Sequence, residues 1–421
     1  MLTFGGMRFA RGPLTLGQRN VLESLSQRSA DADHTDNLDR VVPVPPRTDM
    51  GEVSAAVHAL VRRHETLRTR FPAGAREQVV DGAGMLTIRL CGSVEEARAA
   101  LCAEPFDIVG EWGIRVAAVC RDSRPRSVVL CLSPLAVDAW AANLVADDLR
   151  VLLRGAERPD PMLQPLAQAA AESTSDSRCG QAEALAHLRK VLLVAPPEPQ
   201  GVADPGGWRL GELRSGTVDP AARAVATRCA TTAAVVYLAA AAIGLGAGPH
   251  VLRTVAHNRL TPAEMSCVAP FALDMFVPVD ASGEFDAVVG RTGDAYREAS
   301  RHSRYDPGAV RPLVDEVTET RGSRPDLSVL VHDLRASARP PAGSAATTFR
   351  WREPCRPPEL RWCLAIADDG DVVTLSLLAN ERASIPEFLH GMARLIVAAA
   401  DRVTTVVQPQ AQWCGDRSGK R

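Results

Sequence analysis

The sequence predicts an α/β protein made of two halves of similar size. Val128 to Leu132 is an unbroken apolar run, as expected of a strand that is buried on both faces. Val53, Val57 and Leu60 recur at helical spacing and indicate an amphipathic helix. Helices and strands alternate again in the second half. A chain of 421 residues with 46% hydrophobic content can bury sizeable cores in two or more domains.

Elements of the first half follow from periodicity and caps. A short helix is expected at 14–27, and residues 29–41 are polar and predict a flexible loop. Asp49 is the expected N-cap of the helix that runs to Arg63. Asp138 is expected to begin another helix, with Trp140 on its apolar side. The remaining elements are a helix at 94–102 and strands at 86–91, 113–120 and 128–132.

The second half begins after a helix at 181–194 and a proline-rich stretch at 195–199, which is the best candidate hinge. It repeats the alternation of the first half, so the two halves indicate a pseudo-dimer. The expected strands are 207–217, 251–255, 327–334, 360–366 and 372–378, and 270–279 is extended. The expected helices begin at Pro220 and span 231–244, 285–301, 308–319 and 385–405.

Charge and cysteine content exclude several classes of function. A net charge of -2 gives no general attraction to nucleic acid or to an anionic membrane. The ten cysteines form no CxxC pair, which disfavours a zinc site or a disulfide framework. The N-terminus lacks the pattern of a signal peptide, and 231–247 is rich in alanine and glycine, as in a buried helix. We therefore expect a soluble, cytoplasmic protein without a resident metal.

Several motifs in the first half occur in a recognisable order. Arg63 to Phe71 matches the RHExLRTxF motif of nonribosomal peptide synthetase condensation domains at every fixed position. Upstream, Thr15-x-Gly17-Gln18 resembles the opening motif of that family. Downstream, Pro105-Phe106-Asp107 and Arg115 resemble its PFDL…LR segment.

The second half carries weaker copies of the later motifs. Ala256 to Arg259 resembles the ANR segment, and Val268 to Asp274 resembles the VGxFVNT stretch. The YxDYAxW and RDxSRNPL motifs are poor here, at 166–171 and 321–327. Over residues 8–405 the chain resembles the condensation-domain superfamily, as a divergent, free-standing member.

That resemblance implies two lobes of chloramphenicol-acetyltransferase type, arranged as a V-shaped pseudo-dimer with a substrate tunnel between them. We place the N-terminal lobe at 1–180, the C-terminal lobe at 181–407 and a disordered tail at 408–421. The tunnel would receive substrates on carrier (thiolation) proteins, or one carrier-bound substrate and a free small amine. The protein would have no cofactor of its own, because the carrier supplies the phosphopantetheine arm.

The family's HHxxxDG active-site motif is degenerate in this chain. Ser133 and Pro134 replace the two histidines, whereas Asp138 is retained and is followed by Trp140. Proline has neither a titratable group nor a backbone N–H, so Pro134 cannot replace the second histidine. For Ser133 a packing role is expected. The family pattern pairs the Asp with an Arg, which makes Asp138 and Arg259 a structural salt bridge.

Four other residues are candidates for the missing proton-handling group. The resemblance brings the segments of His302 and His332 toward the tunnel, and Cys131 and Cys267 lie near lobe-contact motifs. A Cys–His pair could form a transient acyl-enzyme. The alternative for each is structural: Cys131 in a buried strand, Cys267 as a small filler, and the histidines as satisfied core or surface residues.

Two functions of different classes follow. The first is an enzyme that joins a carrier-bound (amino)acyl thioester to a small amine in antibiotic-type secondary metabolism. Alignment of the reactants in a tunnel supplies roughly 7–11 kcal/mol of the barrier in favourable cases, even without the histidine. The second is a catalytically silent platform that recruits carrier proteins or tailoring enzymes. The sequence favours the enzyme, because docking domains normally stay fused to their synthetase.

Overall fold

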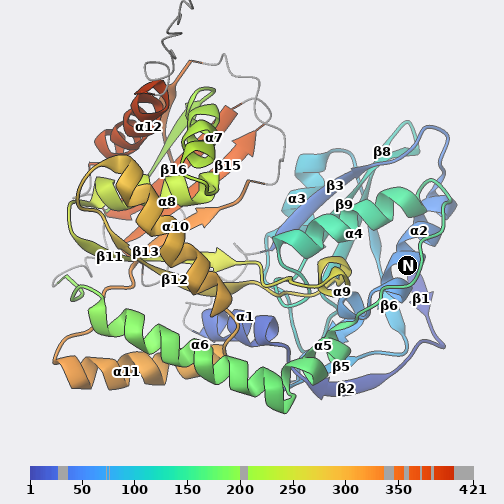
Figure 1. The fold of residues 1–421 in the computed structure, drawn as a ribbon. Coiled ribbons are helices and arrows are strands. Elements are labelled where there is room, and N and C mark those ends of the chain that lie inside the picture. Colours follow the sequence, from blue (N-terminus) through green and yellow to red (C-terminus); the bar gives the residue numbers. More distant parts are fainter. Residues whose placement is uncertain are drawn as a thin grey trace, which may run out of the picture. The chain divides into compact units, whose positions relative to one another are not determined.

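The computed structural model describes residues 1–26, 37–72, 74, 76–199, 207–335, 346–354, 360–369, 372–380 and 384–402 (Figure 1). The tail predicted at 408–421 lies outside these residues. Contacts divide the chain into two compact units, each built from separate stretches of sequence. Unit 1 is 1–194, 255–275 and 299–325, and unit 2 is 195–254, 276–298 and 326–421. The lobes predicted at 1–180 and 181–407 are continuous ranges of sequence, unlike these contact-based units, and they stay a prediction.

Unit 1 is organised on a four-stranded sheet of order β3-β9-β8-β7. Only β7 and β8 are parallel. These strands are β3 (Leu38–Pro43), β7 (Ile88–Cys91), β8 (Ile114–Arg121) and β9 (Arg124–Leu132). Two smaller sheets pair β1 (Leu2–Phe4) with β6 (Gly84–Leu86), and β5 (Glu77–Val80) with both β2 (Ala10–Pro13) and β4 (Thr69–Arg70).

Helices cover both faces of the four-stranded sheet. Side chains alternate along β9, so Val128, Leu130 and Leu132 pack with α2 (Met50–Arg63) and α4 (Ala139–Leu152). Val129 and Cys131 point to the other face and pack with α3 (Val94–Cys102). This arrangement confirms the prediction that 128–132 is buried on both sides. The other helices of unit 1 are α1 (Leu16–Ser26), η2 (Glu65–Arg68), α5 (Pro165–Glu172), α6 (Ser175–Val194), α9 (Pro262–Ser266), η3 (Pro307–Ala309) and α11 (Val310–Arg321).

Unit 2 is organised on a seven-stranded mixed sheet of order β12-β11-β13-β15-β16-β10-β14. The edge strand β12 and its neighbour β11 each continue into unit 1 at one end. The strands are β10 (Trp208–Ser215), β11 (Pro249–Ala256), β12 (Leu273–Asp280), β13 (Val329–Asp333), β14 (Thr348–Arg352), β15 (Trp362–Asp369) and β16 (Val372–Asn380). Its helices are α7 (Val218–Arg228), α8 (Ala233–Leu245), α12 (Ile385–Asp401) and most of α10 (Phe285–Arg301).

The α/β class is confirmed, and the differences from the expected elements have physical causes. Residues 38–41, expected in a loop, belong to β3, where pairing with β9 outweighs the polar composition. Strand β14 was not expected, because its sequence Thr-Phe-Arg-Trp-Arg is short and lies mostly exposed at a sheet edge. Trp140, expected on the apolar side of its helix, is 40% exposed.

Within the described residues, no single helix has the length and apolar character needed to cross a membrane. Helices α7 and α8 reach that threshold only when taken together, by length and composition, and they meet at a bend of 103°. Helix α8 is largely buried, and its fully buried Tyr237 carries a hydroxyl that donates to Asp219 at 3.3 Å.

Candidate functional site

The loop between β9 and α4, residues 133–138, corresponds to the degenerate active-site motif. Ser133 continues from the buried end of β9, and its N–H donates to the carbonyl of Gly113 at 3.0 Å. The carbonyl of Ser133 accepts from Ala136 and Val137, so the chain closes a tight turn before the helix begins. Thr66 fixes the far side of the turn by donating to the carbonyl of Ala136 at 2.7 Å. Hydrogen bonds within the turn and with Gly113 and Thr66 therefore hold the backbone of this loop.

Ser133 and Pro134 differ in exposure. Ser133 is buried, and its hydroxyl oxygen accepts from the N–H of Leu135, as expected of a packing residue. Pro134 is half-buried, whereas its neighbours from Val128 to Val137 are all buried. The position that a second histidine would occupy is therefore the one position of this run that is accessible, and there a proline stands.

Asp138 ends the loop and makes four side-chain hydrogen bonds. Its Oδ1 accepts from the N–H of Ala141 at 2.8 Å, which caps α4. Both carboxylate oxygens accept from Arg259, at 2.9 and 3.0 Å. Oδ2 also accepts from the N–H of Phe271 at 2.9 Å. One carboxylate therefore joins the helix N-terminus to both ends of the 259–271 segment.

Arg259 is the buried partner of Asp138, with a side chain that is fully inaccessible. Besides Asp138, its guanidinium donates to the carbonyls of Glu264, Cys267 and Ala269 at 2.7–2.8 Å. The guanidinium carbon of Arg259 also lies over the ring of Phe271, 4.3 Å from the ring centroid. A guanidinium with its donors in a fixed fork suits such a junction. The ion pair and these carbonyls hold the 259–271 segment against the loop, and we call this group the Asp138–Arg259 frame.

A strained backbone position sets the direction of Arg259. Asn258 has a φ of 52°, in the left-handed region that Asn tolerates better than most residues. Its side chain accepts from the hydroxyl of Ser303 at 2.6 Å and donates to the carbonyl of Ser303 at 3.2 Å. Arg304 donates to the carbonyl of Asn258 and, at 2.8 Å, to Glu264. Residues Ser303 and Arg304 of the 299–325 stretch thus stabilise the segment that carries Arg259.

The opening motif of the sequence lies against the same segment. Gly17 has no room for a side chain, because an added Cβ would stand 2.0 Å from the carbonyl oxygen of Pro270. Thr15 and Gln18 exchange backbone and side-chain hydrogen bonds around the start of α1. Gln18 also donates to Gln78 at 3.0 Å. These contacts explain why Gly and Gln occupy the motif positions.

The RHExLRT motif has a structural role. The buried His64 shares a 2.8 Å hydrogen bond with Asp148 of α4, and Arg63 donates to the same carboxylate at 2.7 Å. Burial lowers the pKa of His64, so the ring is neutral and donates to the carboxylate. Burial by itself raises the pKa of Asp148, but hydrogen bonds from His64 and Arg63 outweigh it and hold that pKa below its ordinary value.

Beside the frame, apolar side chains reach the surface. Trp140 is 40% exposed, Met265 is 37% exposed and Leu260 is 74% exposed. The indole N–H of Trp140 donates to the carbonyl of Met265 at 3.0 Å. The indole also stacks on the ring of His257, with 6.1 Å between the ring centroids. We call these four residues the Trp140 surface. Trp140 is thus fixed in place by polar contacts while its ring remains accessible.

The two candidate cysteines lie in unit 1 and are fully buried. A hydrogen bond with Cys102 and burial raise the pKa of Cys131. Burial raises the pKa of Cys267 to about 12, despite the neighbouring Arg259. A nucleophilic cysteine needs a lowered pKa and an accessible thiolate. Both shifts run in the opposite direction, so the geometry gives no support to an acyl-enzyme on either thiol.

The two candidate histidines fall in different units. His302 follows α10 in unit 1, where its ring stacks on that of His187 at a centroid distance of 4.5 Å. His332 is a half-buried residue of β13 in unit 2, opposite Ala365 of β15. A catalytic role for either histidine stays a prediction.

Glu172 is a notable residue that the sequence did not single out. It ends α5, accepts from the N–H of Leu16 at 2.7 Å and accepts from Gln168 at 2.8 Å. Burial raises the pKa of Glu172 above its ordinary value. Its position at the start of α1 depends on tertiary packing, and the only local sign was a carboxylate after an alanine-rich segment.

Comparison with known proteins identifies the fold. The condensation domain of the monacolin K polyketide synthase MokA has a TM-score of 0.70 at 17% identity, over 94% of this chain and 98% of that one. The X-domain from teicoplanin biosynthesis has a TM-score of 0.68 at 20% identity, over 96% and 97% of the two chains. SgcC5 from Streptomyces globisporus has a TM-score of 0.68 at 18% identity, over 93% and 99%.

Sequence comparison agrees over a shorter range. A stretch of 111 residues is 29% identical to the nonribosomal peptide synthetase kk1B of Curvularia clavata, and it spans 24% of this chain and 1% of that protein. No protein-family model matches the chain. At these identities the structural likeness shows the fold. The chain is condensation-domain-like in fold, which confirms the resemblance carried by its motifs.

Proposed function

We propose that this protein is a condensation-like platform, which binds a carrier protein bearing an acyl or peptidyl chain and does not itself catalyse acyl transfer. The observation that carries the proposal is Pro134 at the accessible position of the active-site loop. Proline can neither accept a proton nor donate a hydrogen bond from its backbone nitrogen. General acid–base catalysis typically contributes about 10² to 10⁴ in rate, so this position forfeits that contribution.

The intact Asp138–Arg259 frame supports a role in binding a partner, because it shows that the structure around the loop is maintained although the histidines are absent. Five hydrogen bonds from one buried guanidinium hold the loop and the 259–271 segment in a fixed arrangement. Breaking a buried ion pair on one side is strongly destabilising. The frame therefore maintains a defined surface around the loop, independently of what stands at Ser133 and Pro134.

The Trp140 surface supplies a contact area of the right kind. Aromatic residues and methionine are enriched where proteins meet, and Trp is prominent among the residues that dominate binding energy. Among similar folds, the X-domain from teicoplanin biosynthesis is known in complex with OxyB. For this chain we assign the Trp140 surface to a carrier protein that delivers its phosphopantetheine-bound chain.

Binding to a loaded carrier protein tests the platform function. We expect measurable affinity by isothermal titration calorimetry for a peptidyl carrier protein loaded with a non-hydrolysable acyl-pantetheine analogue. Trp140→Ala should weaken that affinity about tenfold or more, as for a central interface aromatic. Met85→Ala removes another exposed side chain of unit 1 and is the matched control. Equal affinity of wild type and Trp140→Ala would contradict the assignment of this surface.

A second candidate is an amide synthase that joins the carrier-bound (amino)acyl thioester to a small amine without the usual histidine. Glu172 specifically favours it, because a half-buried carboxyl with a raised pKa is a candidate acid–base group. The carboxylate of Glu172 accepts from Leu16 at the start of α1. The next residue, Gly17, packs against Pro270 of the 259–271 segment. Thioesters are reactive donors, so alignment contributes much of the rate in such an enzyme.

Product formation separates the two functions. The protein is incubated with an aminoacyl carrier protein and a set of small amines, and amide is quantified by mass spectrometry. The platform predicts the uncatalysed rate. Acceleration by the wild-type protein would overturn it, and loss of that acceleration in Glu172→Gln but not in Gln181→Ala would identify the carboxyl as the responsible group.

The finer features of the resemblance belong to the same proposal. We propose that the chain forms two chloramphenicol-acetyltransferase-like lobes with a tunnel between them, that it works on antibiotic-type intermediates and that it acts in the cytoplasm. Small-angle scattering with and without loaded carrier tests the lobe arrangement, since the calculated curve of a V-shaped pseudo-dimer differs from that of a single globule.

A further inference from the structure

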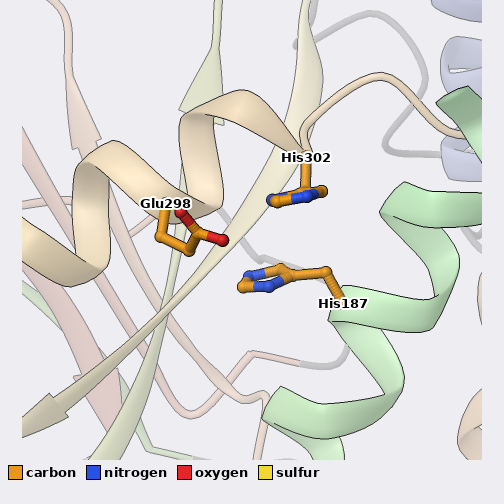
Figure 2. Close-up of side chains that lie close together, drawn as sticks. All are labelled: His187, Glu298 and His302. Atoms are coloured by element: carbon orange, nitrogen blue, oxygen red, sulfur yellow. The ribbon is translucent and has the colours of Figure 1, made fainter.

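Two imidazole rings from distant parts of the sequence meet in unit 1. His187 lies on α6, and His302 follows the last turn of α10. Their ring centroids are 4.5 Å apart and the ring planes differ by 13° (Figure 2). Both residues are half-buried, so the pair lies at the edge of the packed core and remains accessible to small solutes.

A carboxylate accompanies the pair. Glu298 stands four residues before His302, and residues at this spacing share one face of a helix. The boundary between the two units falls within α10, after Glu298, so the helix itself fixes where Glu298 lies relative to His302. Figure 2 shows the carboxylate turned toward the rings. One potential ligand atom from each of the three side chains lies within 4.8 Å of the other two.

We propose that His187, His302 and Glu298 bind one divalent transition-metal ion of the zinc type. Imidazole nitrogen and carboxylate oxygen are both zinc ligands, at about 2.0–2.2 Å from the ion. Three protein ligands leave a fourth position for water or another small ligand. This proposal goes beyond the platform function, and it revises the expectation, drawn from the absence of CxxC pairs, that the chain has no metal site.

The distances are compatible with closure around an ion. Two ligands of a tetrahedral zinc ion stand about 3.3 Å apart, given bonds of about 2.0–2.1 Å. The side chains therefore need to approach by at most about 1.5 Å. Parallel rings direct their nitrogens along parallel lines, so binding also requires one ring to turn out of the stack. Glu298 is exposed, so its carboxylate lies at the surface rather than in the packed core.

The ion would link His187 of α6 to the end of α10. Helix α6 also contacts α11 through the ion pair of Arg189 with Glu316 at 2.7 Å, but this pair is solvent-exposed and contributes little. A metal ion that binds the folded state stabilises it in proportion to the logarithm of its free concentration. We therefore infer a structural ion that stiffens this corner of unit 1.

Metal titration of the full chain tests the site. After treatment with a chelator and dialysis, we expect zinc to bind with one ion per chain and to raise the unfolding temperature. Cobalt(II) in the same site should give the visible absorption of a four-coordinate ion. His187→Ala and His302→Ala should each lower zinc affinity by about 10- to 100-fold or more. Loss of a residue that only supports a metal ligand already has an effect of this size, and loss of a ligand itself should have at least that effect. His250→Ala is the matched control, since His250 belongs to no three-ligand group among the described residues.

Glu298→Gln separates ligand loss from misfolding, because this exposed residue can be replaced without disturbing the core. We expect it to retain the far-ultraviolet circular dichroism of the wild type and to bind zinc more weakly. Absence of stoichiometric zinc binding by the wild type would overturn the proposal. So would the same affinity in wild type and in the folded Glu298→Gln and His302→Ala variants.

Discussion

The two ends of the 133–138 loop differ in how they are held. At one end, Asp138 makes four hydrogen bonds and Arg259 is fully buried. At the other, Pro134 is half-buried and contributes no polar side chain. The difference teaches that the parts of an active-site motif that maintain the fold and the parts that perform chemistry are separable. Substitution at the second end leaves the first intact.

The largest expected effect lies in the frame. Arg259→Ala leaves the buried carboxylate of Asp138 without its partner, so we expect a loss of about 3–5 kcal/mol in the free energy of unfolding. Urea denaturation followed by circular dichroism measures it. Arg98→Ala is the control, because its pair with Asp39 is largely exposed and should contribute under about 1 kcal/mol. A similar loss in both variants would remove the distinction between the frame and an ordinary surface pair.

The next effect concerns the contact behind the frame. Gly17→Ala forces a methyl group toward the carbonyl of Pro270, and overpacking of this kind costs about 1–3 kcal/mol. Gly180→Ala is the matched control, since it lies within α6 with open space around it and should gain up to about 1 kcal/mol. Unfolding temperatures of the two variants should therefore move in opposite directions. A stable Gly17→Ala protein would show that the 259–271 segment yields easily.

A pH-dependent effect comes from the pair of His64 and Asp148. The pKa of His64 is lowered in the folded state, so the unfolded chain takes up the proton first and stability falls as the pH drops below about 6.5. The pKa of Asp148 is also lowered, which adds a further loss as the pH falls below about 3.9. The slope of unfolding free energy against pH measures this. His64→Asn should flatten it below neutral pH, and an unchanged slope would exclude His64 as its source.

The smallest effect is expected at the loop itself. Pro134→His should change the unfolding free energy by about 1 kcal/mol or less, because the position is half-buried and its backbone nitrogen has no donor to lose. Thermal denaturation of wild type and variant checks this. A large destabilisation would mean that Pro134 is itself part of the structural frame, and the contrast between the two ends would fail.

Much of the fold could be predicted where the pattern is local. The helix expected at 94–102 has those bounds in the structure, because Ser93 caps it and its apolar positions recur at helical spacing. The run at 128–132 was read correctly from continuous apolarity. Strand β3 was missed because only its pairing with β9, distant in the sequence, overrides its polar residues.

The site was less predictable, since its chemistry depends on burial and on contacts between distant segments. The exposure of Trp140 follows from its hydrogen bond to Met265, which no helical period reveals. The raised pKa of Cys267 comes from burial in the fold rather than from its neighbours in sequence. His187 and His302 meet only through the packing of α6 beside the end of α10. The hydrogen bond from Leu16 of α1 to Glu172 likewise depends on packing between distant segments.

The Asp138–Arg259 frame also bears on how such proteins change over time. If the half-buried position 134 contributes as little to folding as predicted, a lineage can lose its histidine there without passing through an unstable intermediate. The reverse exchange is equally open to selection or to the protein engineer. Motifs built from the frame therefore report the fold, whereas the residue at position 134 reports only whether the usual histidine is available.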